Sequence, residues 1–434
     1  GLAVLALAWL YLGRAVRRGA DGTSAADLLR TALLWAAPLL VAAPLFSRDM
    51  YSYAAQAQLT HLGLDPYSNG PAAVPGPFLD EVQRMWVDTP APYGPLWLVL
   101  GSLVAGVTGH HVLLTVLAMR MLAVAGTVLI AWFLPRLAAH FGTDPRTALW
   151  LAVLNPLLLV HFVAGGHNDA LMLGLVMAGL WIVVSAVTEA RLAVGVAVIT
   201  LAVLIKAPAA LAVAFAVPIW ASRLDGPHPR SRAAARVAVV GLGTFAAVTL
   251  ASGLGIGWIR QLNTPGAVAN VLSVPTGLAM LVNGVRHVLG LAGDSQAMID
   301  LFRTVGKVVS AVAVLAIWAG SFRGRSFRGQ PVRLLAVALA VVVVLSPVVQ
   351  PWYLLWALVV AAATPLPERA RMVAAGLSVF LSLLITPQGA TLFNMAWPML
   401  TTGFAVAVAT HVALARDREG DPRPARLNAT AEHR

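Results

Sequence analysis

Residues 31–53 read TALLWAAPLLVAAPLFSRDMYSY, an apolar run that ends abruptly in charged and aromatic side chains. The run is hydrophobic enough to enter a bilayer. Arg48 and Asp49 follow where the chain would leave the membrane, and charged groups are costly there unless something nearby needs them. This stretch therefore predicts a membrane helix that leads into a functional surface, with Asp49 as the first candidate residue.

The composition is that of a polytopic membrane protein. Of the 434 residues, 59% are hydrophobic and 11% are charged, whereas soluble domains carry roughly 25% charged residues. Residues 237–254 and 334–346 contain no charge at all. We therefore expect an all-α fold whose apolar helices cross a bilayer. The chain has no cysteine and so forms no disulfide.

The positions of the arginines predict how the chain is threaded through the membrane. If successive apolar runs cross the membrane in alternating directions, 22 of the 30 lysine and arginine residues fall on one side. That side is cytoplasmic by the positive-inside rule, so the net charge of +12 does not indicate a nucleic-acid partner. Several of the runs are shorter than the ~20 residues of a perpendicular span. The runs are 31–46, 112–135, 147–165, 170–187, 192–206, 207–222, 237–255, 305–321, 334–347, 353–366, 372–387 and 398–415.

This threading predicts a single transmembrane domain over 1–415 and a basic cytoplasmic tail over 416–434. Two long loops, 47–94 and 256–304, fall on the extracytoplasmic side. The short apolar run at 2–12 is interpreted as the end of a truncated helix.

The first long loop is expected to carry a short helix. Asp49, Tyr53, Gln56 and Thr60 recur at helical spacing, which indicates a polar stripe on a helix at the membrane surface. The apolar run 96–107 is too short to span and is expected to be tilted or re-entrant.

Two aspartates of this loop have different structural alternatives. Asp65 precedes Pro66, and because Asp before Pro commonly starts a turn, a structural and a functional role are equally open. For Asp49 the structural alternative is an ion pair with Arg48 or with another helix. We favour Asp49 as the functional carboxylate.

A second polar cluster, Gly165-Gly166-His167-Asn168-Asp169, closes a hairpin between two predicted helices. Asn168 or Asp169 can cap the second helix, and the glycines can form the turn. Capping does not account for three consecutive polar groups that include a histidine. His167 and Asp169 could form a metal pair, but two ligands without cysteine are a weak metal signal.

Two further polar features fall on the same side. Lys206 follows the apolar segment Leu201–Ile205, so it either snorkels to the lipid headgroups or meets an anion. Gln350 lies between two prolines and precedes Trp352-Tyr353. Aromatic residues at a membrane end are typical of an interfacial belt, but a helix broken by prolines usually lines a cavity.

Nucleotide-binding motifs are absent from the sequence. It contains no Gly-rich nucleotide loop, Walker motif, Ser nucleophile elbow or His-Glu-x-x-His motif. Group transfer on the outer face would therefore need a donor already activated on a lipid.

The motifs in their order resemble those of a known family. They are Ser47–Tyr53, Gly63–Tyr67, Pro92–Trp97, Asn155-Pro156, Gly166–Met172 and Gln350–Tyr353. The chain resembles the membrane glycosyltransferases of the GT-C fold and, more narrowly, is similar over about residues 31–400 to the actinobacterial polyprenol-phosphate-mannose-dependent α-1,6-mannosyltransferases of lipomannan synthesis. It departs from them in its missing N-terminal start, and it lacks the soluble C-terminal domain of some other GT-C enzymes.

The resemblance implies a GT-C-type bundle of many transmembrane helices with short helices in its extracytoplasmic loops. It also implies a polyprenyl-phosphate-mannose donor, a lipid-anchored mannan acceptor and transfer on the outer face of the plasma membrane. Transfer from a β-linked phosphate to an α product inverts the anomeric carbon, which requires a base and cations for the departing phosphate.

Each candidate residue then receives a role in this hypothesis. Asp49 is the expected base, and Asp169 is a rival base or a sugar ligand. The phosphate-binding candidates are Lys206, Arg48, Arg260 and Arg286. The substrate-binding candidates are Tyr53, Gln56, Asp65, Tyr67, Tyr93, His167, Asn168, Gln350, Trp352 and Tyr353. We expect neither a metal nor another cofactor, because a monophosphate is a good leaving group. Besides the donor and acceptor, the expected partners are membrane lipids; no protein partner is predicted.

Two alternatives remain open from the sequence. A GT-C transferase could use another polyprenol-linked sugar, such as arabinofuranose, or form another linkage. A lipid flippase or transporter would belong to a different class. Transporters place coupling charges near the bilayer midplane between inverted repeats, whereas the polar groups here gather on one side and no second half mirrors the first.

Overall fold

The computed structural model describes residues 1–323 and 330–384, and within these ranges it is helical and contains no strand. The predicted span 398–415 and the tail 416–434 lie outside the described residues. The helices are α1 (Leu2–Arg18), α2 (Ala25–Val41), α3 (Asp49–His61), α4 (Pro77–Glu81), α5 (Pro95–Val107), α6 (Val112–His140), α7 (Pro145–Leu151), α8 (Pro156–Leu158), α9 (Asp169–Val184), α10 (Glu189–Val203), α11 (Ala210–Ala221), α12 (Pro229–Ser252), α13 (Val274–Val288), α14 (Ser295–Gly320), α15 (Gln330–Leu345), α16 (Leu354–Ala362) and α17 (Glu368–Leu383).

Three of the described helices, α6, α12 and α14, are long and apolar enough to cross a membrane. A fourth span is possible if α7 and the helical segment Pro156–Ala164, bent by 51° relative to each other, count as one. The bend falls at Asn155-Pro156, where the buried Asn155 side chain accepts from the Leu157 N–H and donates to the Leu151 carbonyl. Proline cannot continue the helical ladder, and Asn155 satisfies the backbone groups that it frees.

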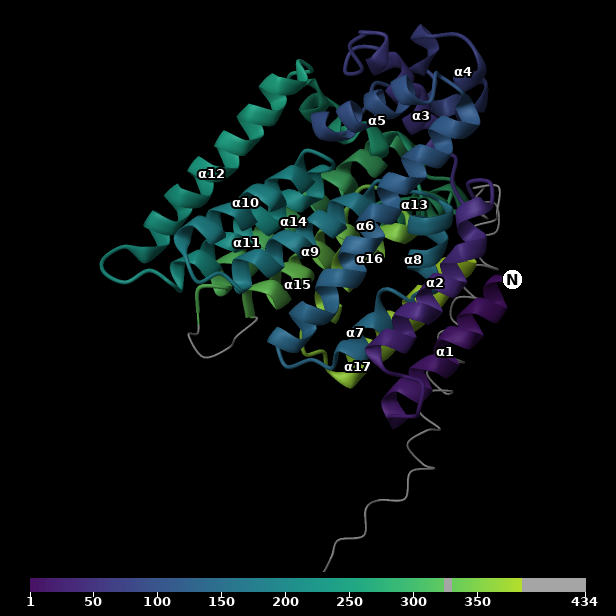
Figure 1. The fold of residues 1–434 in the computed structure, drawn as a ribbon. Helices are drawn as coiled ribbons and strands as arrows, with labels where there is room; N and C mark the ends of the chain where they lie inside the picture. The colour runs from purple at the N-terminus through teal and green to yellow at the C-terminus, as the bar shows by residue number, and fades with distance from the viewer. Residues whose placement is uncertain (324–329, 385–434) are drawn as a thin grey trace, which may run out of the picture.

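Helix α9 lies at the centre of the bundle (Figure 1). Its glycines permit close approach to its neighbours. A Cβ on Gly174 would lie 2.5 Å from the Gly126 carbonyl oxygen of α6, and one on Gly179 would lie 2.5 Å from Ile199 of α10. Small residues let apolar helices approach backbone to backbone, where packing alone must hold them together. This packing fixes the N-terminus of α9, which begins at Asp169.

Arg120 is a charged residue inside the predicted span 112–135, and its contacts account for its presence there. Its side chain is fully buried, and it donates to the carbonyls of Leu40, Ala42 and Ala164 at 2.8, 2.6 and 3.2 Å. It therefore satisfies carbonyls at the end of α2 and in the turn before α9. Its role is structural, since these groups would otherwise be unpaired in an apolar surrounding.

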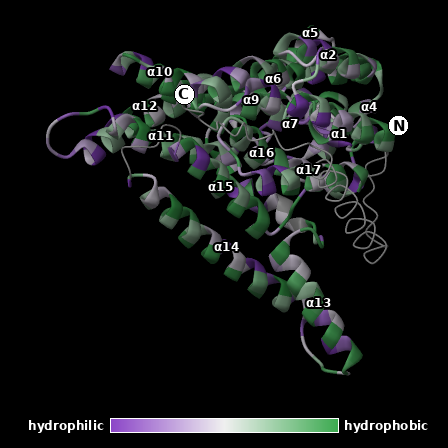
Figure 2. Cartoon of the chain, turned by 90° about the horizontal axis from the view of Figure 1, so that it is seen from below, coloured by the Kyte–Doolittle hydropathy of each residue, from purple (hydrophilic) through white to green (hydrophobic). Residues whose placement is uncertain are grey.

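Two features divide the molecule along its length. Helices α3, α4 and α5 gather at one end, while α7 and α17 lie at the other (Figure 1). Helices α13 and α14 extend away from the rest of the chain (Figure 2).

Helix α3 forms where the polar stripe predicted a helix, but most of its residues are buried, Tyr53 and Gln56 among them. The stripe faces protein because α3 packs against α4, α5 and α6.

Candidate active site

Asp49 and His167 meet where α3 begins. The Nδ1 atom of His167 lies 3.4 Å from Oδ2 of Asp49, and the Ser47 hydroxyl accepts from the Asp49 N–H. Gly166, with φ +65°, turns the chain toward Met50, whose sulfur would lie 2.4 Å from a Cβ at that position. Glycine is therefore needed here for both backbone conformation and space. The Asp49 side chain remains 30% exposed, whereas His167 is fully buried.

Asp169 has both carboxylate oxygens engaged. Lys206 Nζ lies 2.7 Å from Oδ2, and the indole N–H of Trp356 donates to Oδ1 at 2.6 Å. The Asp169 side chain is fully buried at the first residue of α9, where the helix dipole favours negative charge. Asp169 is thus a fully partnered ion.

Three aromatic rings surround the Lys206 ammonium group: Tyr93 at 5.8 Å, Tyr353 at 5.5 Å and Trp356 at 5.8 Å from the ring centroids. These distances are within the range of cation–π attraction. The Pro92–Trp97 motif contributes Tyr93 to these rings, and its Gly94 allows the motif to lie close to Lys206. Gly94 donates to the Ile205 carbonyl, and a Cβ on Gly94 would lie 2.2 Å from the Leu204 oxygen. Only glycine lets this loop lie against the segment before Lys206.

Two pairs of stacked rings lie within the cluster. Trp352 stacks on His167 with centroids 3.8 Å apart, and Tyr353 stacks on Trp356 at 4.2 Å. His161, from the π-helical segment Leu159–Ala164, lies 5.0 Å from Trp352 and is fully buried. Neither His161 nor Trp356 was predicted from the sequence. Both occur in apolar runs. The only local signal for either residue is a ring that carries a polar nitrogen among aliphatic neighbours.

Several buried polar atoms around the cluster have no hydrogen-bond partner within the described residues. They are Ser52 Oγ, Gln56 Oε1, both His161 nitrogens, His167 Nε2, Asn168 Nδ2 and Trp352 Nε1. Tyr53 donates to the other polar atom of Asn168, Oδ1, at 3.4 Å. Buried polar groups are normally paired, so a group of unpaired ones needs a ligand or water to satisfy it.

The surroundings of Asp49 keep it ionised. Burial by itself would raise the pKa of the Asp49 carboxyl, but the His167 ring beside it and the charge of Lys206 lower the pKa below its ordinary value. Burial acts in the same sense on the neighbouring phenols, and there the negative charge of Asp49 adds to it, so the pKa of Tyr53 and that of Tyr93 lie well above the ordinary value. An ionised carboxylate therefore faces neutral hydroxyl donors.

The three predicted arginines do not join this cluster in the described structure. Arg48 turns away to form an ion pair with Glu81 at 2.7 Å and to donate to the Glu81 carbonyl. Arg286 donates to the Ala292 carbonyl in the turn after α13, part of the extended pair of Figure 2. Arg260 is exposed. Of the cations proposed from sequence, Lys206 is the one that contacts a predicted carboxylate.

Three other predicted residues make local or loop–loop contacts. Asp65 is exposed and accepts from the Tyr67 N–H and the Ser68 hydroxyl, as in an Asp-initiated turn. Tyr67 is buried against Gly257, and its carbonyl accepts from Gln261, which joins the two predicted extracytoplasmic loops. Gln350 precedes the short 3₁₀ segment Pro351–Tyr353, and its carbonyl accepts from the Tyr353 N–H. Their predicted roles in substrate binding stay predictions.

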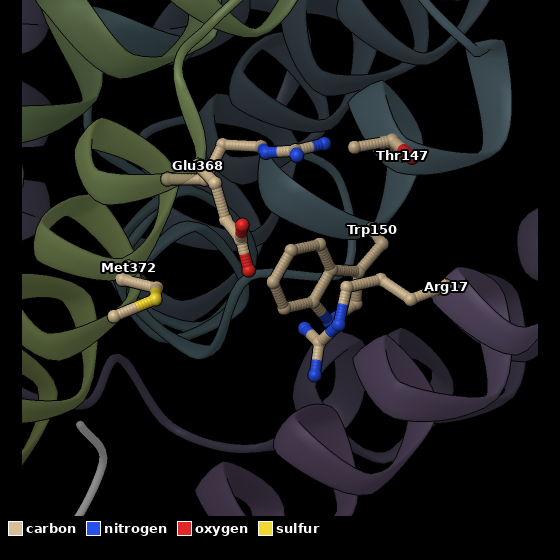
Figure 3. A pocket seen from close by; sticks show the side chains of 6 residues that line it. Arg17, Thr147, Trp150, Glu368 and Met372 are labelled. Carbon is tan, nitrogen blue, oxygen red and sulfur yellow. The ribbon is translucent and has the colours of Figure 1, made fainter. Parts of the chain in front are cut away.

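A hollow at the opposite end of the bundle is separate from this chemistry (Figure 3). It is a small hollow lined by Arg17, Thr147, Trp150, Glu368, Arg371 and Met372. Trp150 lies in the last turn of α7, and the chain must pass the bend at Pro156 to reach His167. Within the described residues no cluster of three His, Asp or Glu side chains suitable for a metal ion is found.

Fold and site together define a class: a helical protein with helices long and apolar enough to cross a membrane and a buried carboxylate–lysine–aromatic cluster suited to acid–base group transfer. Comparison with known proteins identifies the family. The family model Alpha-(1->6)-mannopyranosyltransferase, N-terminal domain, matches residues 1–222, and the model MptB C-terminal domain matches residues 275–416.

Relatives of known name agree over most of the chain. Alpha-(1->6)-mannopyranosyltransferase A of Mycobacterium tuberculosis is 36% identical over 395 residues, covering 90% of this chain and 75% of the relative. Alpha-(1->6)-mannopyranosyltransferase A of Corynebacterium glutamicum is 35% identical over 412 residues, covering 90% and 82%. No solved structure matches the chain. The chain belongs to the alpha-(1->6)-mannopyranosyltransferase family and is a glycosyltransferase, as its motifs predicted.

Proposed function

We propose that the protein transfers mannose from a polyprenyl-phosphate-mannose donor to a hydroxyl of a lipid-anchored mannan, with inversion, forming an α-1,6 linkage on the extracytoplasmic face. The names of the relatives support mannose and this linkage over arabinofuranose, and membership of a transferase family favours an enzyme over a flippase. The mechanism rests on one observation: Asp49 and Asp169, the two carboxylates of the site, differ in exposure and in their partners.

Asp49 is the better base of the two. A base must have a free oxygen that a substrate hydroxyl can reach. Asp169 is fully buried, and Lys206 and Trp356 occupy both of its oxygens. Asp49 is 30% exposed, is held ionised, and contacts His167 through one oxygen only. Asp169 instead holds Lys206 in position.

The reaction is a single displacement. The acceptor hydroxyl oxygen bonds to the anomeric carbon of mannose while the bond from that carbon to the phosphate oxygen breaks. The hydroxyl proton passes to Asp49, and the electron pair of the broken bond leaves with the lipid phosphate. Lys206 stabilises that phosphate, since one of its three donor hydrogens is directed to Asp169 and the others remain for phosphate oxygens. A monophosphate leaving group makes a metal unnecessary in this scheme.

The proposals of a lipid-linked donor and of transfer on the outer face rest on the sequence. Nucleotide-binding motifs are absent, and the arginine distribution assigns the side of the 47–94 loop to the exterior. The unpaired polar atoms beside Trp352 support a sugar as the bound group, because hydroxyls would pair them.

The test compares Asp49→Asn with the wild type in membranes supplied with labelled polyprenyl-phosphate-mannose and a mannan acceptor. We expect transfer to fall by about 10²–10⁴-fold, the usual contribution of a positioned base, with donor binding and expression kept. A nucleoside-diphosphate mannose should give no product with either protein.

Near wild-type transfer by well-expressed Asp49→Asn would remove Asp49 as the base and leave Asp169 as the candidate. Linkage analysis of the product tests the proposed α-1,6 linkage, and any other linkage would refute that part of the proposal.

A further inference from the structure

The second long loop, 256–304, is bonded to the chain segment that leads into Trp352. Residues 346–350 form a link between the end of α15 and the 3₁₀ segment Pro351–Tyr353. Three side chains of the loop donate hydrogen bonds to backbone carbonyls of this link, and all three are at most 1% exposed. These clamp residues are Asn270, Ser273 and Thr276, which donate to the carbonyls of Val349, Ser346 and Pro347 at 2.8, 2.7 and 2.7 Å, respectively.

The link needs such partners because it cannot continue a helix. Pro347 and Pro351 have no N–H and interrupt the helical ladder, so carbonyls of the link lack the partners that a helix would supply. Val348 and Val349 are buried, which keeps the link away from solvent. A buried carbonyl without a partner is costly. The clamp residues remove that cost and at the same time fix the position of the link.

The clamp residues are themselves held in place. The Ser273 hydroxyl accepts from the Thr276 N–H at the start of α13, and Asn270 Oδ1 accepts from the Ser273 N–H. Arg303 of α14 donates from Nε to the Thr276 hydroxyl at 3.0 Å, and its other nitrogens donate to two carbonyls of the segment before α13. Because a hydroxyl has one hydrogen, the bond from Arg303 leaves the hydrogen of Thr276 for the link carbonyl.

The turn that follows the link is rigid. Pro351 has a fixed φ, and the Gln350 carbonyl accepts from the Tyr353 N–H at 2.9 Å, which closes the 3₁₀ turn. The position of the link therefore determines where the rings of Trp352 and Tyr353 lie.

These two rings support both halves of the active site. Trp352 stacks on His167 with centroids 3.8 Å apart, and His167 contacts Asp49. The Tyr353 ring lies 5.5 Å from the Lys206 ammonium. One short segment thus contacts a partner of the proposed base and the proposed phosphate cation.

We propose that the three clamp residues are positioning residues for the transfer reaction, because they hold the link and so set the rings of Trp352 and Tyr353 in the active site. The proposal rests on the proposed function, since that function places a base and a phosphate cation beside these rings. It gives the second long loop a role that requires no contact between the clamp residues and the substrate.

The test removes one clamp bond with little change of shape. Thr276→Val loses the hydroxyl, whereas Thr276→Ser keeps it. Thr304→Val is the matched control, since Thr304 is an exposed residue of α14 whose hydroxyl donates to the Asp300 carbonyl of its own helix. Each variant is assayed in membranes with labelled polyprenyl-phosphate-mannose and a mannan acceptor.

We expect Thr276→Val to lower kcat by about 10²-fold, as small misplacements of active-site groups do, and to change donor KM much less. Thr276→Ser and Thr304→Val should stay near the wild-type kcat. If thermal unfolding shows that Thr276→Val does not fold, Asn270→Ala takes its place, because it removes the bond to the Val349 carbonyl.

A double-mutant cycle separates positioning from a general loss of structure. Residues that act through a shared partner have non-additive effects. Thr276→Val should therefore lower kcat far less in a Trp352→Phe background than in the wild type.

A spectroscopic measurement follows the ring itself. In protein labelled with fluorotryptophan, the fluorine resonance that disappears in Trp352→Phe belongs to Trp352. That resonance should shift in Thr276→Val and keep its wild-type position in Thr304→Val.

Additive effects in the cycle, or an unmoved Trp352 resonance, would overturn the positioning role while leaving the proposed function intact. If the wild type gave no product from the polyprenyl donor, the proposed function would fail, whereas a shifted resonance would still tie the clamp residues to Trp352.

Discussion

The two carboxylates of the active site belong to the same residue class and differ in almost every other respect. Asp49 begins a helix at the edge of the cluster, keeps 30% of its side chain exposed and has a histidine at 3.4 Å. Asp169 begins the central helix α9, is fully buried and is held by a lysine and an indole at 2.7 and 2.6 Å. One carboxylate keeps part of its surface exposed, and the other is enclosed by its partners.

The difference teaches that a buried charge and a reactive charge need opposite surroundings. An ion with no exposure must have its lone pairs filled, because an unpaired charge in an apolar interior is very costly. A base must keep an unfilled lone pair near the surface. Removing partners from each carboxylate should therefore have different consequences for stability and for activity.

The largest effect is expected at the occupied carboxylate. Lys206→Met leaves Asp169 buried beside an uncharged chain, which costs roughly 3–5 kcal/mol of folding free energy, and it removes the phosphate cation, lowering kcat by about 10²–10³-fold. Thermal unfolding in detergent and initial transfer rates measure the two effects.

The double variant Lys206→Met with Asp169→Asn provides the control. It removes both charges, so it should recover most of the lost stability but none of the lost activity. Recovery of transfer in the double variant would mean that Lys206 does not act on the donor phosphate.

An intermediate effect is expected at the reactive carboxylate. His167→Phe keeps the ring stack on Trp352 but removes the group that lowers the Asp49 pKa, so burial then raises that pKa. The base works when deprotonated, and activity is lost as pH falls through its pKa. The acid limb of the kcat/KM profile should therefore move to higher pH in His167→Phe.

His161→Phe is the matched control, since His161 also lies beside Trp352 and makes no contact with Asp49 within the described residues. Its acid limb should stay where the wild type has it. An unshifted limb in His167→Phe would show that Asp49 and His167 are not coupled.

The smallest effect is expected at the neighbouring Arg48–Glu81 pair, whose side chains are 44% and 45% exposed. Exposed pairs contribute about 0–1 kcal/mol, so Arg48→Ala and Glu81→Ala should change stability by no more than this and change donor KM equally little. A large rise in donor KM with Arg48→Ala, absent from Glu81→Ala, would restore Arg48 as a phosphate ligand.

Much of the fold could be predicted from local sequence. Long apolar runs predicted helices where α6, α12 and α14 occur, although α14 begins at Ser295 rather than at 305 because its first turns are polar. The helical spacing from Asp49 to Thr60 predicted α3. The burial of α3 could not be predicted, because it depends on α5 and α6 packing against it.

The site was predicted less completely. Asp49, His167, Asp169, Lys206 and Trp352 were chosen from sequence because polar groups beside apolar runs are costly without a purpose. Trp356 was missed because tryptophan in an apolar helix has no such cost. Arg48 was assigned to phosphate because its sequence position is next to Asp49, whereas its side chain reaches Glu81.

By itself, then, the sequence determined that this chain is helical with helices apolar enough to cross a membrane and, through its ordered motifs, which family it resembles, because hydrophobicity and short motifs are local properties. Only the tertiary structure decided which carboxylate is occupied and which is open. Asp169 is separated from Lys206 by 37 residues and from Trp356 by 187. Contacts over such distances depend on how helices pack, and packing is a property of the whole chain.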